Sequence, residues 1–246
     1  MEVPSYIALS RLVAQSRALE VTATNMANAN TPGFKAERVL FSDWLSQQTG
    51  ADAPRGGRVV SFVQDRATYR DQQAGPVQQT GNPFDLALGG DGYFSVESAR
   101  GPRLTRAGRF TPMADGRLGD ADGNALLDAA GQPIRTGAAD QRIVVAADGT
   151  ISSENGRLGK IGVVRPSDPM RVTSEGARLM RADTNTVPVD KPQVIQGAVE
   201  DSNVQPVLEM TRMMADLREF QFTTQFVQDE ADRLQSSIDK LTQRKA

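Results

Sequence analysis

Residues 207–243, VLEMTRMMADLREFQFTTQFVQDEADRLQSSIDKLTQ, contain no proline and no glycine and repeat an apolar residue every three or four positions. The steps alternate between 3 and 4 over more than four heptads, which is the a/d spacing of a coiled-coil helix. Pro206 comes directly before the stretch, at a position where a helix begins. We therefore predict a helix from Val207 to Thr242, about 54 Å long. Its apolar stripe, in which Thr224 is the one polar position, consists of Met210, Met213, Leu217, Phe220, Thr224, Val227, Ala231, Leu234, Ile238 and Leu241.

A shorter stretch near the N-terminus has the same spacing and ends at the turn-forming run Asn28–Gly33. Two helices of matching period at the two ends of the chain predict an antiparallel pair, a coiled coil formed within one chain. Ser16 and Ala23 interrupt the shorter stripe, so we expect it to leave part of the longer stripe uncovered. Two interpretations stay open: an ordinary intramolecular coiled coil, or one whose uncovered part contacts neighbouring subunits. The large apolar residues of both stripes, which form the expected assembly interface, are Leu9, Leu12, Leu19, Met26, Met210, Met213, Leu217, Phe220, Val227, Leu234, Ile238 and Leu241.

The composition excludes several classes of function. The 246 residues suffice for one large domain or two small ones, and 28 basic residues nearly balance 30 acidic ones. This balance gives no electrostatic signature of a nucleic-acid partner or of an anionic membrane surface. Cysteine and histidine are absent, which excludes disulfides, thiolate or imidazole metal sites, and Ser-His-Asp or Cys-His catalysis. The N-terminus lacks a cleavable signal pattern and no long apolar run occurs, so we expect neither a cleaved signal peptide nor membrane insertion.

The residues between the two helices indicate an antiparallel β domain. From Gly81 to Gly197, short apolar runs alternate with turn-forming residues at intervals of roughly 8–12 residues, which is typical of all-β domains. Four dipeptides suit hairpin turns with a positive φ: Asp115-Gly116, Asp122-Gly123, Asp148-Gly149 and Asn155-Gly156. The predicted fold class is α+β, with long N- and C-terminal helices paired around a central antiparallel β domain. The predicted domains are residues 1–33 with 198–246 (helical), 34–80 (a connecting segment with one short strand at Val59–Val63) and 81–197 (all-β).

No group of residues has the pattern of a catalytic or metal site. Asp120 and Asp122 are spaced carboxylates, but Gly123 comes too early for a calcium loop and the closing glutamate is missing, so we expect a hairpin turn. The run Gly89–Gly92 lacks the spacing of a phosphate-binding loop. We therefore expect no enzymatic activity, no cofactor and no metal. A glycan hydrolase, which would need two carboxylates about 5–10 Å apart, stays as an alternative that sequence alone does not exclude.

Four stretches resemble sequence signatures of the rod and hook family, the axial proteins of the bacterial flagellum. They are Asn25–Lys35 (NMANANTPGFK), Gly81–Phe94 (GNPFDLALGGDGYF), Leu104–Phe110 (LTRAGRF) followed by Asp115–Leu118 (DGRL), and Gln196–Val204 (QGAVEDSNV). The first stretch departs from the family pattern at Met26 and has the single asparagine Asn25 after Thr24. The order and spacing of the four stretches extend the resemblance over nearly the whole chain. The residues that match the family pattern are Asn25, Asn28, Thr31, Gly33, Phe34, Asn82, Phe84, Asp85, Gly92, Thr105, Arg106, Gly108, Phe110, Gln196, Gly197, Glu200, Ser202, Asn203 and Val204.

The resemblance implies a structural subunit of the flagellar basal-body rod, whose paired terminal helices form the wall of a tube with the β domain outside. Its implied partners are other rod subunits and copies of itself, packed helically to transmit torque from motor to hook. The family also implies export by the flagellar type III apparatus without a cleaved signal, and terminal helices that stay loose until neighbours arrive. The modest length favours a rod over a hook protein and, with Leu104–Phe110, the proximal over the distal rod. A distal rod protein, or a surface β-domain binding module on a coiled-coil stalk, stays as an alternative.

Overall fold

The computed structural model describes residues 3–48, 58–137, 140, 142–168 and 171–243. The fold is α+β, as predicted, with a helix near each end of the chain and antiparallel strands between them. The chain divides into two compact units. Residues 1–27, 37–71 and 205–246 form the first, which we call the helix–hairpin unit. Residues 28–36 and 72–204 form the second, which we call the β unit.

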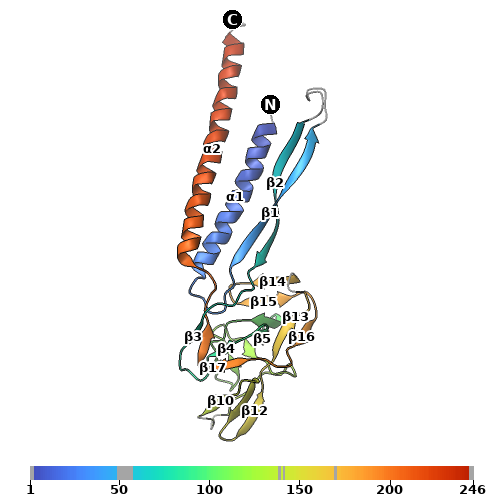
Figure 1. Cartoon of the computed structure of the whole chain (residues 1–246), viewed down its shortest axis with the longest axis vertical. Coiled ribbons are helices and arrows are strands. Elements are labelled where there is room, and N and C mark those ends of the chain that lie inside the picture. The colour runs from blue at the N-terminus through green and yellow to red at the C-terminus, as the bar shows by residue number, and fades with distance from the viewer. Residues whose placement is uncertain (1–2, 49–57, 138–139, 141, 169–170, 244–246) are drawn as a thin grey trace. The chain divides into compact units, whose positions relative to one another are not determined.

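The helix–hairpin unit contains α1 (Val3–Ala27), α2 (Pro206–Gln243) and an antiparallel ribbon of β1 (Glu37–Gln48) and β2 (Arg58–Arg70). The two helices run antiparallel, and the ribbon lies along α1 (Figure 1). Helix α2 begins one residue before the predicted start and ends one residue after the predicted end. It is this long because Pro206 fits the first turn and no proline or glycine follows it.

The ribbon differs from the sequence prediction. The sequence predicts one short strand in the connecting segment 34–80, whereas the structure has three strands there: β1 and β2, of 12 and 13 residues, and the short β3 (Val77–Gln79). The register pairs Glu37 with Arg70, and a bulge interrupts it between Leu40 and Phe41. Strand β1 lacks the strict alternation of apolar and polar residues that identifies a half-buried strand, so its pairing with β2 has no clear sequence signal.

Helix α1 buries a different face from the one that its apolar stripe indicates. Leu9 is 55% exposed and Met26 is 37% exposed. Small side chains allow two helices to approach closely, and Gln15 and Asn25 hydrogen-bond to residues of α2. The large apolar residues therefore do not mark the face that α1 buries within this chain. From Tyr6 onward, where the side chains of α1 are described, the buried ones are small or polar apart from one valine: Ala8, Ala14, Gln15, Val21, Thr22 and Asn25.

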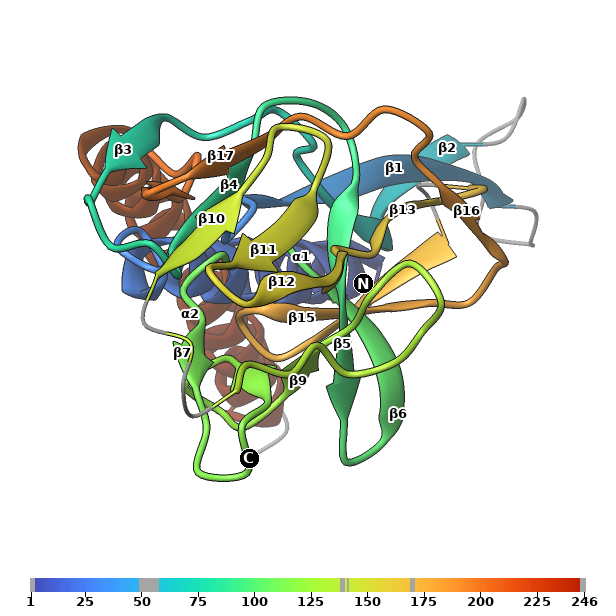
Figure 2. The ribbon, with the colours of Figure 1, turned by 90° about the horizontal axis from the view of Figure 1, so that it is seen from below.

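The β unit is built from short antiparallel strands in several small sheets. The strands are β3 (Val77–Gln79), β4 (Leu86–Leu88), β5 (Tyr93–Ser98), β6 (Gly101–Thr105), β7 (Thr111–Pro112), β8 (Leu118–Gly119), β9 (Ala125–Leu126), β10 (Ile143–Val145), β11 (Thr150–Ser153), β12 (Gly156–Lys160), β13 (Val163–Pro166), β14 (Val172–Glu175), β15 (Leu179–Ala182), β16 (Thr186–Pro188), β17 (Val194–Gln196) and β18 (Ala198–Glu200). The largest sheet has the order β14-β15-β6-β5-β9-β8-β7, with β13 joined to β5 and β16 joined to β13. A three-stranded sheet, β10-β11-β12, and the pairs β17-β4 and β18-β3 complete the unit (Figure 2).

The four predicted hairpin dipeptides all lie in turns of the β unit. They connect β7 to β8, β8 to β9, β10 to β11 and β11 to β12. Their glycines have the positive φ that the turns require, between 80° and 84° at Gly116, Gly123 and Gly149 and 134° at Gly156. Behind these hairpins, the main core is centred on Phe94 and Phe110, whose rings meet edge to face with centroids 5.6 Å apart.

The boundaries of the two units differ from the predicted domains. Residues 28–36, 72–80 and 198–204 belong to the β unit rather than to the helical or connecting segments. Strand β18 pairs with β3, and the segment 28–36 contributes Phe34 and Ala36 to a small core with Val204. The β unit is therefore assembled from two separate pieces of the chain.

Candidate functional site

Three of the four motif stretches meet at the carboxylate of Glu200, whose side chain is 1% exposed in the β unit. The Lys35 ammonium contacts Glu200 Oε1 at 2.5 Å, and an Arg106 N–H donates to Oε2 at 3.0 Å. Both cationic side chains are also buried. Removing either cation would leave a buried charge uncompensated, which costs several kcal/mol, on the order of 3–5. We call Lys35, Gln73, Gly75, Arg106, Glu200 and Asn203 the Glu200 cluster.

Backbone groups of the β unit complete the bonding of this carboxylate. The Gly75 N–H donates to Glu200 Oε1 at 3.0 Å, and the Gly33 N–H donates to the Glu200 carbonyl at 2.7 Å. The Lys35 ammonium also donates to the carbonyl of Gln73 at 2.7 Å. Three segments that lie far apart in the sequence are therefore held to one another by a single buried residue and its partners.

The side-chain amide of Asn203 joins the same three segments a second time. Its oxygen accepts a hydrogen bond from the Ala36 N–H at 2.7 Å, and its nitrogen donates to the Gln73 carbonyl at 3.0 Å. An amide can satisfy both groups because it carries an acceptor and donors on adjacent atoms. Asn203 therefore holds the segments around Ala36 and Gln73 next to its own segment through neutral hydrogen bonds.

Two motif glycines allow the backbones around this cluster to approach closely. Gly33 has a φ of 72°, and a Cβ there would lie 2.3 Å from the Ala107 nitrogen. A Cβ on Gly108 would lie 1.6 Å from the carbonyl oxygen of Leu86. Neither obstacle is a flexible side chain, so any other residue at these positions requires the backbone to move.

A second buried carboxylate lies in the helix–hairpin unit. Glu209, in the first turn of α2, has a fully buried side chain that accepts hydrogen bonds at 2.7 Å from both Arg38 and Arg212. The amide of Asn25 also donates to it at 3.2 Å. An anion at the N-terminus of a helix is further stabilised by the helix dipole. We call Asn25, Glu37, Arg38, Arg70, Glu209 and Arg212 the Glu209 cluster.

The remaining members of the Glu209 cluster tie the base of the ribbon to α1. The Asn25 side chain accepts from the Glu37 N–H at 2.8 Å and donates to the Glu37 carbonyl at 2.9 Å, as a paired strand residue would. The Glu37 carboxylate accepts two hydrogen bonds from Arg70, at 3.1 and 3.3 Å. The end of α1, both strands of the ribbon and the start of α2 are thus joined by polar contacts.

The other motif residues have local structural roles. Asn82 and Asp85 form a turn through a 3.1 Å side-chain hydrogen bond, and the Asp85 carbonyl accepts from the Gly197 N–H at 2.8 Å. Thr105 donates through its hydroxyl to the Arg178 carbonyl at 2.8 Å. Further motif residues in turns or cores are Asn28 and Thr31 (a turn), Phe34 and Val204 (one small core), Phe84 and Phe110 (the main core), Gly92 (φ 131°), Gln196 (bonded to Pro83 and Ile143) and Ser202 (bonded to Val204).

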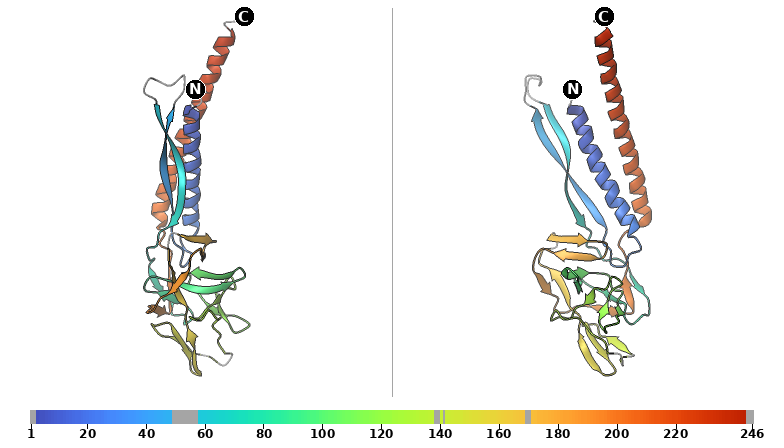
Figure 3. Two further views of the ribbon diagram at one scale, coloured as in Figure 1. Left: turned by 90° about the vertical axis from the view of Figure 1, so that its right-hand side faces the viewer. Right: turned by 180° about the vertical axis from the view of Figure 1, so that it is seen from behind.

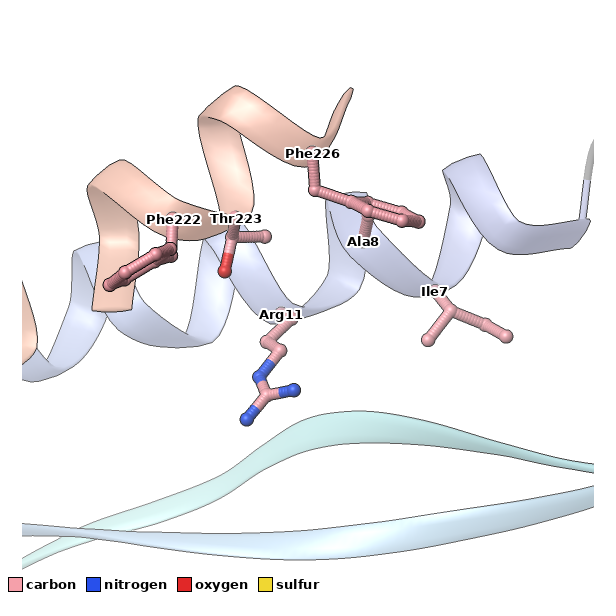
Figure 4. A pocket seen from close by; sticks show the side chains of 6 residues that line it. All are labelled: Ile7, Ala8, Arg11, Phe222, Thr223 and Phe226. Carbon is pink, nitrogen blue, oxygen red and sulfur yellow. The ribbon is translucent and has the colours of Figure 1, made fainter. Parts of the chain in front are cut away.

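Much of the apolar surface of α2 is accessible in this chain. Phe222 is 79% exposed and Phe226 52% exposed, and with Ile7, Ala8 and Arg11 of α1 they line a groove between the two helices (Figure 4). Of the predicted interface residues, Leu9, Met26, Met210, Leu217 and Ile238 are exposed and Leu12, Leu19, Met213, Phe220, Val227 and Leu234 are half-buried. The side chain of Leu241 lies outside the described residues.

The register of the helix pair leaves the C-terminal end of α2 without α1 beside it. Gln15 hydrogen-bonds to Glu219, and Asn25 hydrogen-bonds to Glu209. A step of ten residues toward the C-terminus of α1 therefore corresponds to a step of ten residues toward the N-terminus of α2. At this register Val3, the first residue of α1, lies opposite Ala231. Residues 232–243 of α2 therefore extend beyond the start of α1 (Figure 3). This segment carries Leu234 and Ile238 of the apolar stripe.

The carboxyl group of Asp216, on α2, has a shifted pKa. Its partial burial, together with the negative charge of Glu219, raises its pKa above the ordinary value, although Arg212 opposes this effect. Ionised Asp216 is thus disfavoured on the half-buried face of the helix. We therefore expect the ionised carboxylate at this position to weaken the helix–hairpin unit.

The described residues offer little chemistry of other kinds. Among them, no group of three or more potential metal-ligating side chains could hold an ion. The Asp120 carboxylate accepts hydrogen bonds from the backbone of Asp122 and Asn124, as expected of a turn. Within the same residues, no helix has the length and apolar character needed to span a membrane.

Sequence reasoning missed several members of the two clusters. Glu209, Arg38 and Arg212 are charged residues next to apolar positions, and periodicity assigns such residues to a solvated face. Gln73 and Gly75 lie in a polar stretch and take part through their backbone. One residue could have indicated the Glu200 cluster from sequence. Lys35 is the last residue of the first motif stretch, and a lysine that is buried needs a carboxylate partner.

Comparisons with known proteins agree with the four motif stretches. Residues 6–35 match the family described as "Flagella basal body rod protein", 87–153 match "Flagellar hook protein FlgE/F/G D1 domain", and 195–240 match "Flagellar basal body rod FlgEFG protein C-terminal". The Glu200 cluster draws Lys35, Arg106 and Glu200 from these three matched segments.

Individual relatives match over almost the full chain. The flagellar basal-body rod protein FlgF of Caulobacter vibrioides is 36% identical over 243 residues, covering 98% of each chain. FlgF of Mesorhizobium japonicum is 35% identical over 251 residues, again covering 98% of each. The flagellar basal-body rod protein FlgG of Agrobacterium fabrum is 32% identical over 261 residues, covering 95% of this chain and 97% of FlgG.

Proposed function

Because the chain belongs to the flagellar basal-body rod protein family, we propose that it is a structural subunit of the basal-body rod, of the FlgF type. The observation that carries this proposal is the uncovered apolar surface of α2. Residues 232–243 extend past α1, and Leu217 and Ile238 are exposed. A helix with an apolar stripe on its surface is stabilised when other helices cover it, as subunits in a helical assembly do.

The interface of this assembly consists of the two apolar stripes, whose large apolar residues are those predicted from the sequence, with Leu9 the first on α1 and Leu241 the last on α2. Each large apolar side chain that becomes fully buried contributes roughly 1.5–3 kcal/mol, so a few of them per contact suffice for a stable polymer. The half-buried members complete their burial against neighbouring subunits. Other rod subunits and further copies of this chain are the partners, and torque passes through the packed helices from motor to hook.

The finer assignments rest on the relatives. The two FlgF relatives described above match at 36% and 35% identity, against 32% for FlgG of Agrobacterium fabrum, and this supports the proximal rod over the distal rod. The localisation that follows is the basal body, reached by export through the flagellar type III apparatus without a cleaved signal. The chain is not an enzyme in this proposal, because its buried carboxylates are paired with cations rather than presented to a substrate.

The test is made in the native host. The gene is deleted, and the deletion is complemented either with the unchanged chain or with an unrelated soluble protein of similar size. We expect the deletion strain to lack complete hook–basal bodies and motility, and the unchanged chain to restore both and to be recovered in purified basal bodies. Intact basal bodies in the deletion strain would contradict the proposal.

A further inference from the structure

A cavity of about 480 Å³ lies on the β unit and is lined entirely by residues of that unit. Three charged residues line it: Asp91, two residues before β5, Arg106, directly after β6, and Arg165, in β13. A cavity of this volume holds a small organic molecule, since ligand sites measure roughly 300–1,000 Å³. Packing in a rod does not require such a cavity, and its charged lining indicates the kind of ligand that it would hold.

The carboxylate of Asp91 and the guanidinium of Arg165 are both exposed and carry opposite charges. They line this cavity together, and they also line a neighbouring cavity of about 550 Å³. They do not form an ion pair with each other, and within the described residues neither side chain has a hydrogen-bond or ion-pair partner. Two opposite charges that face one cavity without pairing are complementary to a ligand with both an anionic and a cationic group.

The buried guanidinium of Arg106 adds a hydrogen-bond donor to the same cavity. Its two terminal nitrogens donate to Glu200 Oε2 at 3.0 Å and to the Gly90 carbonyl at 2.9 Å. Its Nε is also buried but has no hydrogen-bond partner among the described residues. The guanidinium carbon lies 5.4 Å from the centroid of the Tyr93 ring, and an aromatic face is only a weak acceptor.

A buried donor without an acceptor is destabilising, and a carboxylate is the acceptor that a guanidinium binds most strongly. A ligand carboxylate placed between Arg106 Nε and Arg165 would satisfy the buried donor and the free charge together. Val187 and Pro166 line the same cavity and offer apolar contact to the rest of such a ligand.

We propose that this cavity binds a small zwitterion, a free α-amino acid or a short peptide. The ligand carboxylate accepts from Arg106 Nε and pairs with Arg165, and the ligand ammonium pairs with Asp91. This binding site goes beyond the role of a rod subunit and does not depend on it.

Titrations of the purified full chain followed by amide NMR test the charge requirement of the site. The probes are L-alanine, which has both charged groups, propionate and ethylamine, which each lack one, and trialanine, whose charges lie further apart. We expect L-alanine or trialanine to shift the amides of Gly92, Ser167 and Val187, with a dissociation constant on the order of 1 mM.

Propionate and ethylamine should each bind roughly tenfold or more weakly, because each leaves one charged residue of the cavity without a partner. Tighter binding of L-alanine than of trialanine identifies a free amino acid as the ligand, and the reverse order identifies a peptide. Equal binding of all four probes, or no shift at these amides with any of them, would overturn the proposal.

Two variants assign the ligand's charges to residues. Arg165→Gln and Asp91→Asn each remove one charge and nearly keep the size of the side chain, and neither breaks a side-chain contact of the described residues. Arg165→Gln should bind the tighter zwitterion and ethylamine alike, and Asp91→Asn should bind the tighter zwitterion and propionate alike. Arg135→Gln, at an exposed position outside the cavity, is the control and should bind as the unchanged chain does. An advantage of the zwitterion that survives in both variants, or that is lost equally in the control, would refute the site.

Discussion

The side-chain amide of Asn25 donates a hydrogen bond to the buried carboxylate of Glu209 at 3.2 Å, across 184 positions of the sequence. Asn25 ends the buried face of α1, and Glu209 lies in the first turn of α2. The same asparagine is bonded in both directions to the backbone of Glu37. One motif residue thus sets the register of the helix pair and the position of the ribbon.

Replacing this asparagine tests that role. Asn25→Leu keeps the size of the side chain but leaves the Glu37 backbone groups and one Glu209 oxygen without this partner. Because the helix pair is only marginally stable in the free subunit, a loss of about 2–3 kcal/mol should unfold it, and we expect the helical circular dichroism of the monomer to fall without denaturant. Asn30→Leu, at an exposed position, is the control. An equal effect of both substitutions would contradict the assignment.

The second prediction concerns the apolar stripe of α2. Leu217→Asp and Leu234→Asp should abolish incorporation into the rod, because each would bury an unpaired charge between subunits. Leu217 is 42% exposed in the free chain, so Leu217→Asp should leave the fold of the monomer intact. Arg218→Ala, next to the stripe, should have a mild effect. Basal bodies purified from complemented cells give the measurement, and similar defects in all three variants would refute the stripe as an interface.

The third prediction concerns the close approach at Gly108. A methyl group there would collide with the Leu86 carbonyl, so Gly108→Ala requires two backbone segments of the β unit to separate. We expect the β unit to lose on the order of 3 kcal/mol of stability or to fail to fold. Gly90→Ala is the matched control, since its Cβ would meet no atom within 4 Å. Thermal melting followed in the far ultraviolet compares the two, and equal melting temperatures would disprove the steric argument.

Features that depend on neighbouring residues in the sequence can be predicted, whereas features that depend on contacts between distant segments cannot. Helix α2 is predictable to within a residue at each end because a 3-4 spacing and the absence of breakers are local properties. The four hairpin turns are predictable because Asp-Gly and Asn-Gly have a local conformational preference. The ribbon is less predictable, because pairing of β1 with β2 depends on a partner strand and on α1 rather than on either sequence alone.

The site divides in the same way. Motif resemblance points to Asn25, Arg106 and Glu200, but it does not say that Lys35 and Arg106 share one carboxylate, which is a contact over 94 to 165 positions. Glu209 has no sequence signal beyond its place in a first helical turn. Sequence patterns identify elements, whereas buried ion pairs depend on how those elements meet.

The fourth prediction is a pH dependence. Burial and Glu219 raise the pKa of Asp216, so the folded chain binds this proton more tightly than the unfolded chain does. Its contribution to stability is present below the ordinary aspartate pKa, near 3.9, and is lost as the pH rises through the raised value. We expect Asp216→Asn to raise the melting temperature of the helical signal at pH 7.

The difference between Asp216→Asn and the unchanged chain should shrink as the pH falls below about 4, where Asp216 is protonated in both states. Asp232→Asn, an exposed aspartate on the same helix, is the control and should show no such trend. A stabilisation by Asp216→Asn that is equally large at pH 3.5 and pH 7 would show that the cause is not the charge.

The last prediction concerns the free subunit. The α1 face toward α2 is composed of small and polar residues, and α2 extends past it, so the pair buries little apolar area for two long helices. Ordering a helix costs about 1–2 kcal/mol per residue in backbone entropy, which weak burial barely offsets. We expect rapid amide exchange and protease cleavage in residues 3–27 and 207–243 of a verified monomer, with protection in the strands of the β unit. Residues 28–36 should be protected as well, because Gly33 and Lys35 are bonded into the β unit. Slow exchange through both helices would show that they already satisfy each other, and the role of the uncovered stripe in assembly would then fail.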